Sequence, residues 1–216
     1  MKRIVCLLAL LASPLCLMAQ TPQEIVARMS ETMEARESEG VYMIVDVRVP
    51  IIGTISSKTW ILGEKTRIES KMLGTKMIIW EDETTEWSYN VKKNTVEISS
   101  SMLPAADSAA VAGTESNSDG DLSMFSGIDK DYEIVLQKET EDAWYLRCKR
   151  RKEVKDDDAP KTINLVVAKG TFLPISFSAK ASGATLTMHD IAFGVSAAQV
   201  TFNPADYPSA TIIDKR

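Results

Sequence analysis

The stretch Val41-Tyr42-Met43-Ile44-Val45-Asp46-Val47-Arg48-Val49 places valine or methionine at every second position. Successive side chains of a β-strand point to opposite faces of a sheet, so this period of two predicts a strand with one apolar face. Pro50 and Gly53 follow directly, and both residue types favour turns. The stretch therefore predicts a strand that ends in a tight reversal of the chain.

Further runs of the same kind follow, and most are separated by short turns rich in glycine, acidic residues or lysine. Strands joined in this way pair as antiparallel hairpins, because a parallel connection needs a dozen or more residues. The further strands are expected at residues 55–62, 66–72, 76–81, 85–91, 95–99, 132–138, 143–150, 161–168, 172–181, 183–192 and 198–203. A meander of about eleven strands must curl or close to protect its edges, so we expect a curved, mainly β sheet.

A helix is expected before the first strand. Thr21 is a good N-cap, Pro22 suits the first helical position, and Glu24 completes a capping box. Gly40 is the expected stop. One stripe of this helix is apolar and is predicted to lie against the sheet; it comprises Ile25, Val26, Met29 and Met33.

Residues 102–128 interrupt the strands halfway along the chain. An alanine-rich run and a short apolar run favour helices there, with the small polar segment 113–121 between them. We expect this insertion to cover one face of the sheet. No linker divides the remainder, so residues 20–216 are expected to form a single domain.

Residues 1–19 have the pattern of a signal peptide. Lys2 and Arg3 precede an apolar run over residues 4–17, and cleavage is expected near Ala19-Gln20. Cys16 follows Ser13-Pro14-Leu15, which does not form a lipobox, so we expect the mature chain to carry no lipid anchor. The sequence thus predicts export to the periplasm.

Charge and cysteine content narrow the possible functions. Without residues 1–19 the chain has 23 basic and 30 acidic residues, a net charge of −7. Nucleic-acid binding depends on neutralising phosphates, so an acidic chain without a strong basic face is a poor candidate for it. Cys148 is the one cysteine left, which excludes an intramolecular disulfide, and its alternation with Trp144 and Leu146 predicts a buried thiol.

Catalytic and cofactor motifs are lacking in the sequence. His189 is the single histidine and has no metal-binding motif around it, so a structural or surface role is favoured. Residues 115–126 lack the first aspartate and twelfth glutamate of a calcium loop. We therefore expect no enzyme, metal or cofactor. The eight methionines after residue 19 suit a surface for varied apolar ligands as well as a core.

Three stretches of the chain have the order and spacing of motifs in a known protein family. The first is Thr59-Trp60-Ile61-Leu62, followed after a short turn by residues 66–72. In residues 78–90 an aromatic residue and a tyrosine follow an acidic turn, and the last stretch is residues 197–204 with Ile212-Ile213-Asp214. Together they resemble the second and third strands, the next hairpin, and the closing motif with its terminal strand in the periplasmic outer-membrane lipoprotein carrier (LolA-like) family.

This resemblance implies an unclosed half-barrel of antiparallel strands, capped by helices, with an apolar cavity for acyl chains. It implies a monomeric periplasmic carrier that moves lipoproteins or another lipid from an inner-membrane donor towards an outer-membrane acceptor. The alternative is a lipid-sensing or protein-binding module on the same fold, without transport. Strand parity leaves open which face of the sheet is concave. The expected cavity lining comprises Met29 and Met33 from the helix and Val45, Val47, Val49, Ile68, Met72, Trp87, Tyr89 and Trp144 from the strands.

The sequence departs from the family at one position. The resemblance would place an arginine, which holds a helical lid shut, just after the strand that contains Trp60. Here Gly63-Glu64-Lys65 occupies that turn, and Arg67 is offset from it. We therefore expect the cover that residues 102–128 form to open easily.

Overall fold

A computed structural model describes residues 20–72, 74–101, 125, 127–155, 159–181 and 183–216. The expected signal peptide, its cleavage site and nearly all of the insertion at 102–128 lie outside these residues. No helix within the described ranges is long and apolar enough to cross a membrane.

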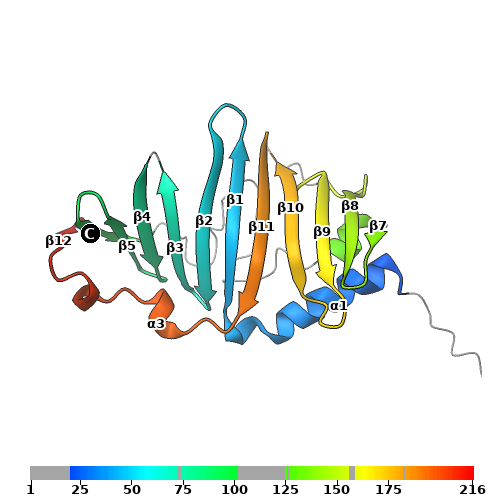
Figure 1. Cartoon of the computed structure of the whole chain (residues 1–216), viewed down its shortest axis with the longest axis horizontal. Helices are drawn as coiled ribbons and strands as arrows, with labels where there is room; N and C mark the ends of the chain where they lie inside the picture. Colours follow the sequence, from blue (N-terminus) through cyan, green and yellow to red (C-terminus); the bar gives the residue numbers. More distant parts are fainter. Residues whose placement is uncertain (1–19, 73, 102–124, 126, 156–158, 182) are drawn as a thin grey trace, which may run out of the picture.

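Twelve strands of the described chain form one sheet in the order β12-β6-β5-β4-β3-β2-β1-β11-β10-β9-β8-β7 (Figure 1). The strands are β1 (Val41–Val49), β2 (Gly53–Leu62), β3 (Lys65–Met72), β4 (Thr75–Glu81), β5 (Thr85–Asn90), β6 (Thr95–Ser100), β7 (Tyr132–Glu139), β8 (Ala143–Arg150), β9 (Thr162–Ala168), β10 (Pro174–Ala181), β11 (Ala184–Phe193) and β12 (Thr211–Asp214). Strands β12 and β7 are the two edges and do not pair with each other. The prediction of a mainly β, unclosed sheet is confirmed.

The twelve strands form two meanders instead of the single one expected. Strands β1 to β6 pair in sequence, as do β7 to β11, and the two sets meet where β1 pairs with β11. Strands β6 and β7 therefore lie far apart, although they are consecutive in the sequence. β12 pairs with β6 in parallel and is the one parallel partner in the described sheet.

The N-terminal helix α1 (Pro22–Ala35) has the predicted start. Thr21 accepts a hydrogen bond from the Glu24 backbone, and the Glu24 carboxylate accepts one from the Thr21 backbone in return. The helix ends earlier than expected, and the 3₁₀ turn η1 (Glu37–Glu39) links it to Gly40. Gly40 has φ +68°, and a Cβ atom there would lie 2.7 Å from the Ile61 carbonyl oxygen.

The remaining helical elements are short. α2 (Ile128–Asp131) precedes β7, and α3 (Ala197–Val200) and the 3₁₀ turn η3 (Pro204–Asp206) follow β11. The predicted strand at 198–203 is wrong. Ser196 and Gln199 form a capping box, which starts a helix in place of a strand.

The face of the sheet that packs on α1, here called the helix face, carries most of the core. Val41 and Met43 of β1 are each 2% exposed, and they pack with the α1 stripe predicted from the sequence. Leu146, Leu165 and Phe177 bring β8, β9 and β10 into the same cluster. The core therefore lies mainly over β7–β11 and the first half of β1.

The opposite face, here called the tail face, has a second cluster over β4–β6. Trp80 is 3% exposed and lies edge-on to Phe202 and Tyr207, at 5.3 and 5.6 Å between ring centres. Trp87 stacks on Phe202 at 5.8 Å. Residues 197–207 therefore cover this part of the sheet from the side opposite α1.

Candidate functional site

The helix face continues past the core as a strip of half-buried aliphatic and methionine side chains. We call this strip the apolar band. Its members are Val45, Val47, Val49, Ile55, Ile68, Met77 and Ile79. They come from β1 to β4, which lie next to the strands that α1 covers.

Strand pairing divides the band into one apolar group on β1 and β2 and another on β3 and β4, with Ser57, Thr59 and Ser70 between them on the same face. Val47 lies opposite Ile55, and Ile68 lies opposite Ile79. Val45 pairs with Met188, which belongs to the buried core. The band is thus an extension of the core that the described part of the chain covers only partly.

Eight of the ten residues in the predicted lining lie either on α1 or at strand positions that belong to the helix face. Met29 and Met33 of α1 are buried in the core, at 0% and 1% exposed. Val45, Val47, Val49 and Ile68 are band residues. The structure therefore brings the helix and strand parts of the predicted lining to one face.

Two of these eight stand apart from the band. Met72 ends β3, and its side chain lies outside the described residues. Trp144 is half-buried on β8, where its ring lies 5.3 Å from that of Phe172, so it packs beside α1 at a distance from the band strands.

Trp87 and Tyr89 do not join the other eight. The register runs without a shift from Val45 through Ser57, Ser70 and Met77 to Asn90, so Asn90 shares the face of Val45. Neighbouring residues of a strand alternate between faces, which places Trp87 and Tyr89 on the tail face. The prediction that all ten residues share one cavity therefore needs correction at these two positions.

Arg67 has a role that the sequence did not reveal. Its guanidinium lies between the rings of Trp60 and Trp80, at 5.0 and 5.4 Å from their centres. It donates to the Gln199 carbonyl oxygen at 3.4 Å and pairs with Glu69. Arg67 thus fixes the C-terminal segment to the tail face. This placement follows from the position of Arg67 opposite Trp60 and Trp80 in the strand register, which local sequence patterns do not determine.

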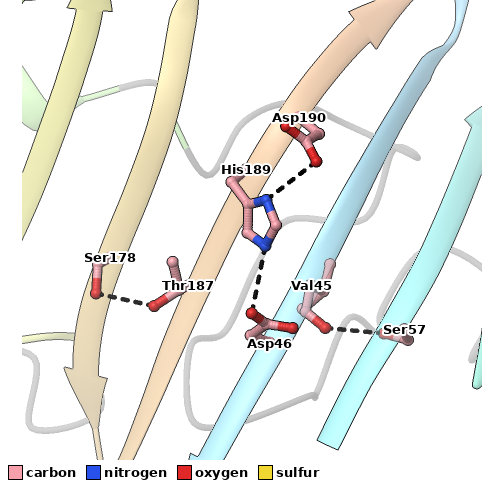
Figure 2. A network of polar contacts seen from close by, with 7 residues as sticks. All are labelled: Val45, Asp46, Ser57, Ser178, Thr187, His189 and Asp190. Carbon is pink, nitrogen blue, oxygen red and sulfur yellow. Dashed lines mark hydrogen bonds and ion pairs between the residues drawn. The ribbon is translucent and has the colours of Figure 1, made fainter. Parts of the chain in front are cut away.

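The single histidine lies in a polar network on β1 and β11 (Figure 2). His189 Nε2 is 3.3 Å from the Asp46 carboxylate, and Nδ1 is 3.3 Å from the Asp190 carboxylate. Ser178 and Thr187 form a separate hydroxyl pair at 3.2 Å. Both imidazole nitrogens thus face carboxylates and neither faces a hydroxyl, so His189 is not placed to activate a serine or threonine nucleophile.

Cys148 is fully buried in the core, as the strand pattern predicted. Burial in apolar surroundings raises the pKa of its thiol to about 12. At that pKa the reactive thiolate is scarce at neutral pH. Within the described residues, no group of three or more histidine, cysteine or acidic side chains could hold a metal ion.

No protein-family model and no curated protein matches the chain. Among solved structures it is similar to an uncharacterised conserved protein from Thermus thermophilus, with 17% identity and a TM-score of 0.45 over 91% of this chain and 100% of that one. It is similar to a chain of the Pseudomonas aeruginosa MucA/MucB complex, with 11% identity and a TM-score of 0.46 over 84% of this chain and 61% of that one. It is also similar to a LolA superfamily protein from Nitrosomonas europaea, with 11% identity and a TM-score of 0.34 over 87% and 100% of the two chains.

Proposed function

We propose that this protein is an exported carrier that binds the acyl chains of lipoproteins or of another lipid on the apolar band. The observation that carries the proposal is the contrast between two parts of one face. Met43 belongs to the core and is 2% exposed. Val47 lies four residues further along β1 on the same face and is half-buried. Apolar side chains that the described chain covers only partly offer area to an apolar ligand.

The free energy of solvating a lipid explains why such a surface is useful. Moving an acyl chain of about 15 methylenes through water costs on the order of 12 kcal/mol, at ~0.8 kcal/mol for each methylene. Contact with the band removes part of that cost. Dispersion contacts have little directionality, so a ligand held by them can pass on to a better site.

The expected signal peptide supports a periplasmic location for this activity, between two membranes. A carrier there would receive its ligand from an inner-membrane donor and deliver it towards an outer-membrane acceptor. The band supplies binding without catalysis, since moving an intact acylated molecule between membranes breaks no covalent bond. The predicted lining is retained in this proposal for Val45, Val47, Val49 and Ile68.

The test is a titration with an environment-sensitive fluorescent fatty acid. The unmodified protein should bind it at micromolar concentration. Val47→Glu should weaken binding by roughly 10-fold or more, because the carboxylate must then lose water beside the acyl chain. Val135→Glu, at a residue that is 45% exposed on edge strand β7, is the matched control and should bind normally. Equal binding by both variants would remove the band as the site.

A lipoprotein-release assay with inner-membrane vesicles separates carriage from sensing. A carrier should release acylated lipoprotein into the soluble fraction, and Val47→Glu should reduce that release. Probe binding without any release would instead identify a lipid-sensing module on the same fold.

A further inference from the structure

The tip of the β1–β2 hairpin exposes two large apolar side chains. Ile51 is fully exposed and Ile52 is 70% exposed, the two highest values among large hydrophobic residues of the described chain. Ile51 also has φ +78°, a conformation that is unfavourable for a β-branched residue. Figure 1 shows this hairpin extending beyond the ends of strands β3, β4, β10 and β11. The two isoleucines are therefore held away from any packing within the described chain.

Cationic residues gather at the same end of the sheet. Alternating antiparallel strands bring the β1–β2, β3–β4 and β5–β6 turns to one end, and the β10–β11 turn joins them because β11 pairs with β1. The exposed cations at or near these four turns are Arg48, Lys71, Lys76, Lys92, Lys93 and Lys180. Lys76 pairs with Glu69 at 2.8 Å, while the other five form no ion pair with a described residue.

The arrangement of these cations is unfavourable in the free protein. Lys71 and Lys76 are direct cross-strand partners. Arg48 and Lys180 both lie opposite Thr185, from its two sides. Like charges that are direct partners repel one another, although Glu69 offsets part of this at Lys76. An anionic surface would be attracted to all of these cations.

The other end of the sheet has the opposite charge. The β2–β3, β4–β5, β7–β8 and β9–β10 turns meet there, and they hold five acidic residues against Lys65 and Lys169; the acidic residues are Glu64, Asp82, Glu83, Glu141 and Asp142. The protein is thus polarised along its strands although its net charge is negative. An anionic surface would attract the hairpin end and repel the other, which orients the molecule before contact.

We propose that the hairpin end docks on the surface of an anionic phospholipid membrane, with Ile51 and Ile52 inserted between headgroups. Apolar side chains at a protruding tip, surrounded by lysine and arginine, combine the two interactions that hold proteins on anionic bilayers. Arg48 and the four hairpin lysines that lack an ion pair then contact lipid phosphates. This docking does not depend on what the apolar band binds, and it would bring the band close to a membrane that supplies or receives lipid.

The charges favour a lipid surface over a second copy of the chain. Two hairpin ends carry the same positive charge and would repel each other. A bilayer offers many phosphates in one plane, which matches cations spread over four turns. The β8–β9 connection at the same end carries charges of both signs, so the cationic area is that of the four hairpins.

The test is vesicle cosedimentation of the exported protein. The unmodified chain should bind vesicles of phosphatidylglycerol with phosphatidylcholine, bind poorly to phosphatidylcholine alone, and dissociate as salt is raised. Ile51→Ser with Ile52→Ser should lower the partition coefficient at least roughly 10-fold. Lys71→Gln with Lys180→Gln should remove the preference for phosphatidylglycerol.

Ile212→Ser with Ile213→Ser is the matched control, since these β12 residues are 50% and 40% exposed but lie outside the four hairpins. This variant should bind vesicles like the unmodified chain. Equal losses in both isoleucine pairs, or no vesicle binding by the unmodified protein, would overturn the proposal. The proposal would also be overturned if the unmodified protein bound no vesicles but formed concentration-dependent dimers, and if Ile51→Ser with Ile52→Ser abolished those dimers. In the absence of vesicles, every hairpin variant should still bind the fatty-acid probe. Loss of vesicle docking can therefore be distinguished from loss of acyl binding on the apolar band.

Discussion

The two halves of the sheet bury opposite faces. Over β7–β11 and the start of β1, the helix face is closed by α1, and Val41 is 2% exposed. Over β4–β6, the tail face is closed by residues 197–207, and Val96 is 0% exposed. One 14-residue helix cannot cover twelve strands, and the chain closes the far half from the other side. The apolar band lies where the helix-face cover ends, so its partial exposure follows from this division of the cover.

The largest effect is expected from a comparison of two sites on β1, one in the covered core and one in the partly covered apolar band. Met43→Glu places an unpaired carboxylate in the core and should lower the free energy of unfolding by about 4 kcal/mol. Val47→Glu, on the same face, should lower it by less than about 1.5 kcal/mol, because water reaches the band. Urea denaturation followed by circular dichroism measures both. If Val47→Glu unfolds the protein as fully as Met43→Glu does, the band is ordinary core.

The tail-face cluster should be separable from the band. Trp80→Ala removes the ring that contacts both Phe202 and Tyr207 and should destabilise the protein by about 3 kcal/mol. Hydrogen exchange at residues 197–207 should become faster, while fatty-acid binding by the remaining folded protein stays unchanged. Tyr145→Ala, at a residue that is 36% exposed on β8, is the control and should change stability little. Lost ligand binding in Trp80→Ala would show that the two faces are coupled.

Individual elements show which features of the fold can be predicted from the sequence and which cannot. The period of two in residues 41–49 and the capping box of Thr21 and Glu24 suffice to predict β1 and α1, since both depend on local patterns. The face on which Trp87 lies does not follow from such a pattern, because it depends on the register across four consecutive hairpins. A slip of one residue in any turn reverses the face of every later side chain. The same limit hid the contact between Arg67 and the C-terminal segment, which are more than 130 residues apart.

Arg67 allows a finer test of how the tail-face cover is held. Arg67→Lys keeps the charge but loses the planar group between Trp60 and Trp80, and it should cost about 1 kcal/mol of stability. Differential scanning calorimetry measures the change. Arg48→Lys, at an exposed position, should have no measurable effect on unfolding. Equal effects of the two substitutions would mean that the stacked position of Arg67 does not stabilise the fold.

The smallest effect expected near neutral pH concerns Cys148 in the helix-face core. Its folded pKa of about 12 lies above the ordinary value of 9.0, so the unfolded chain ionises first as pH rises. The thiol should therefore not reduce stability below pH 9, and stability should fall as pH rises from there towards 12. A thiol reagent at pH 8 should label Cys148 slowly in the native protein and rapidly in urea. Rapid native labelling would show that this part of the core opens.

Native mass spectrometry of the protein purified from the periplasm of cells that export it tests the central claim most directly. The unmodified chain should carry additional mass equal to one or more acyl lipids, and gentle activation should release a lipid ion. Val47→Glu should lose most of that mass, and Val135→Glu should keep it. A bare chain mass for the unmodified protein, or the same bound mass on all three, would contradict acyl binding on the apolar band.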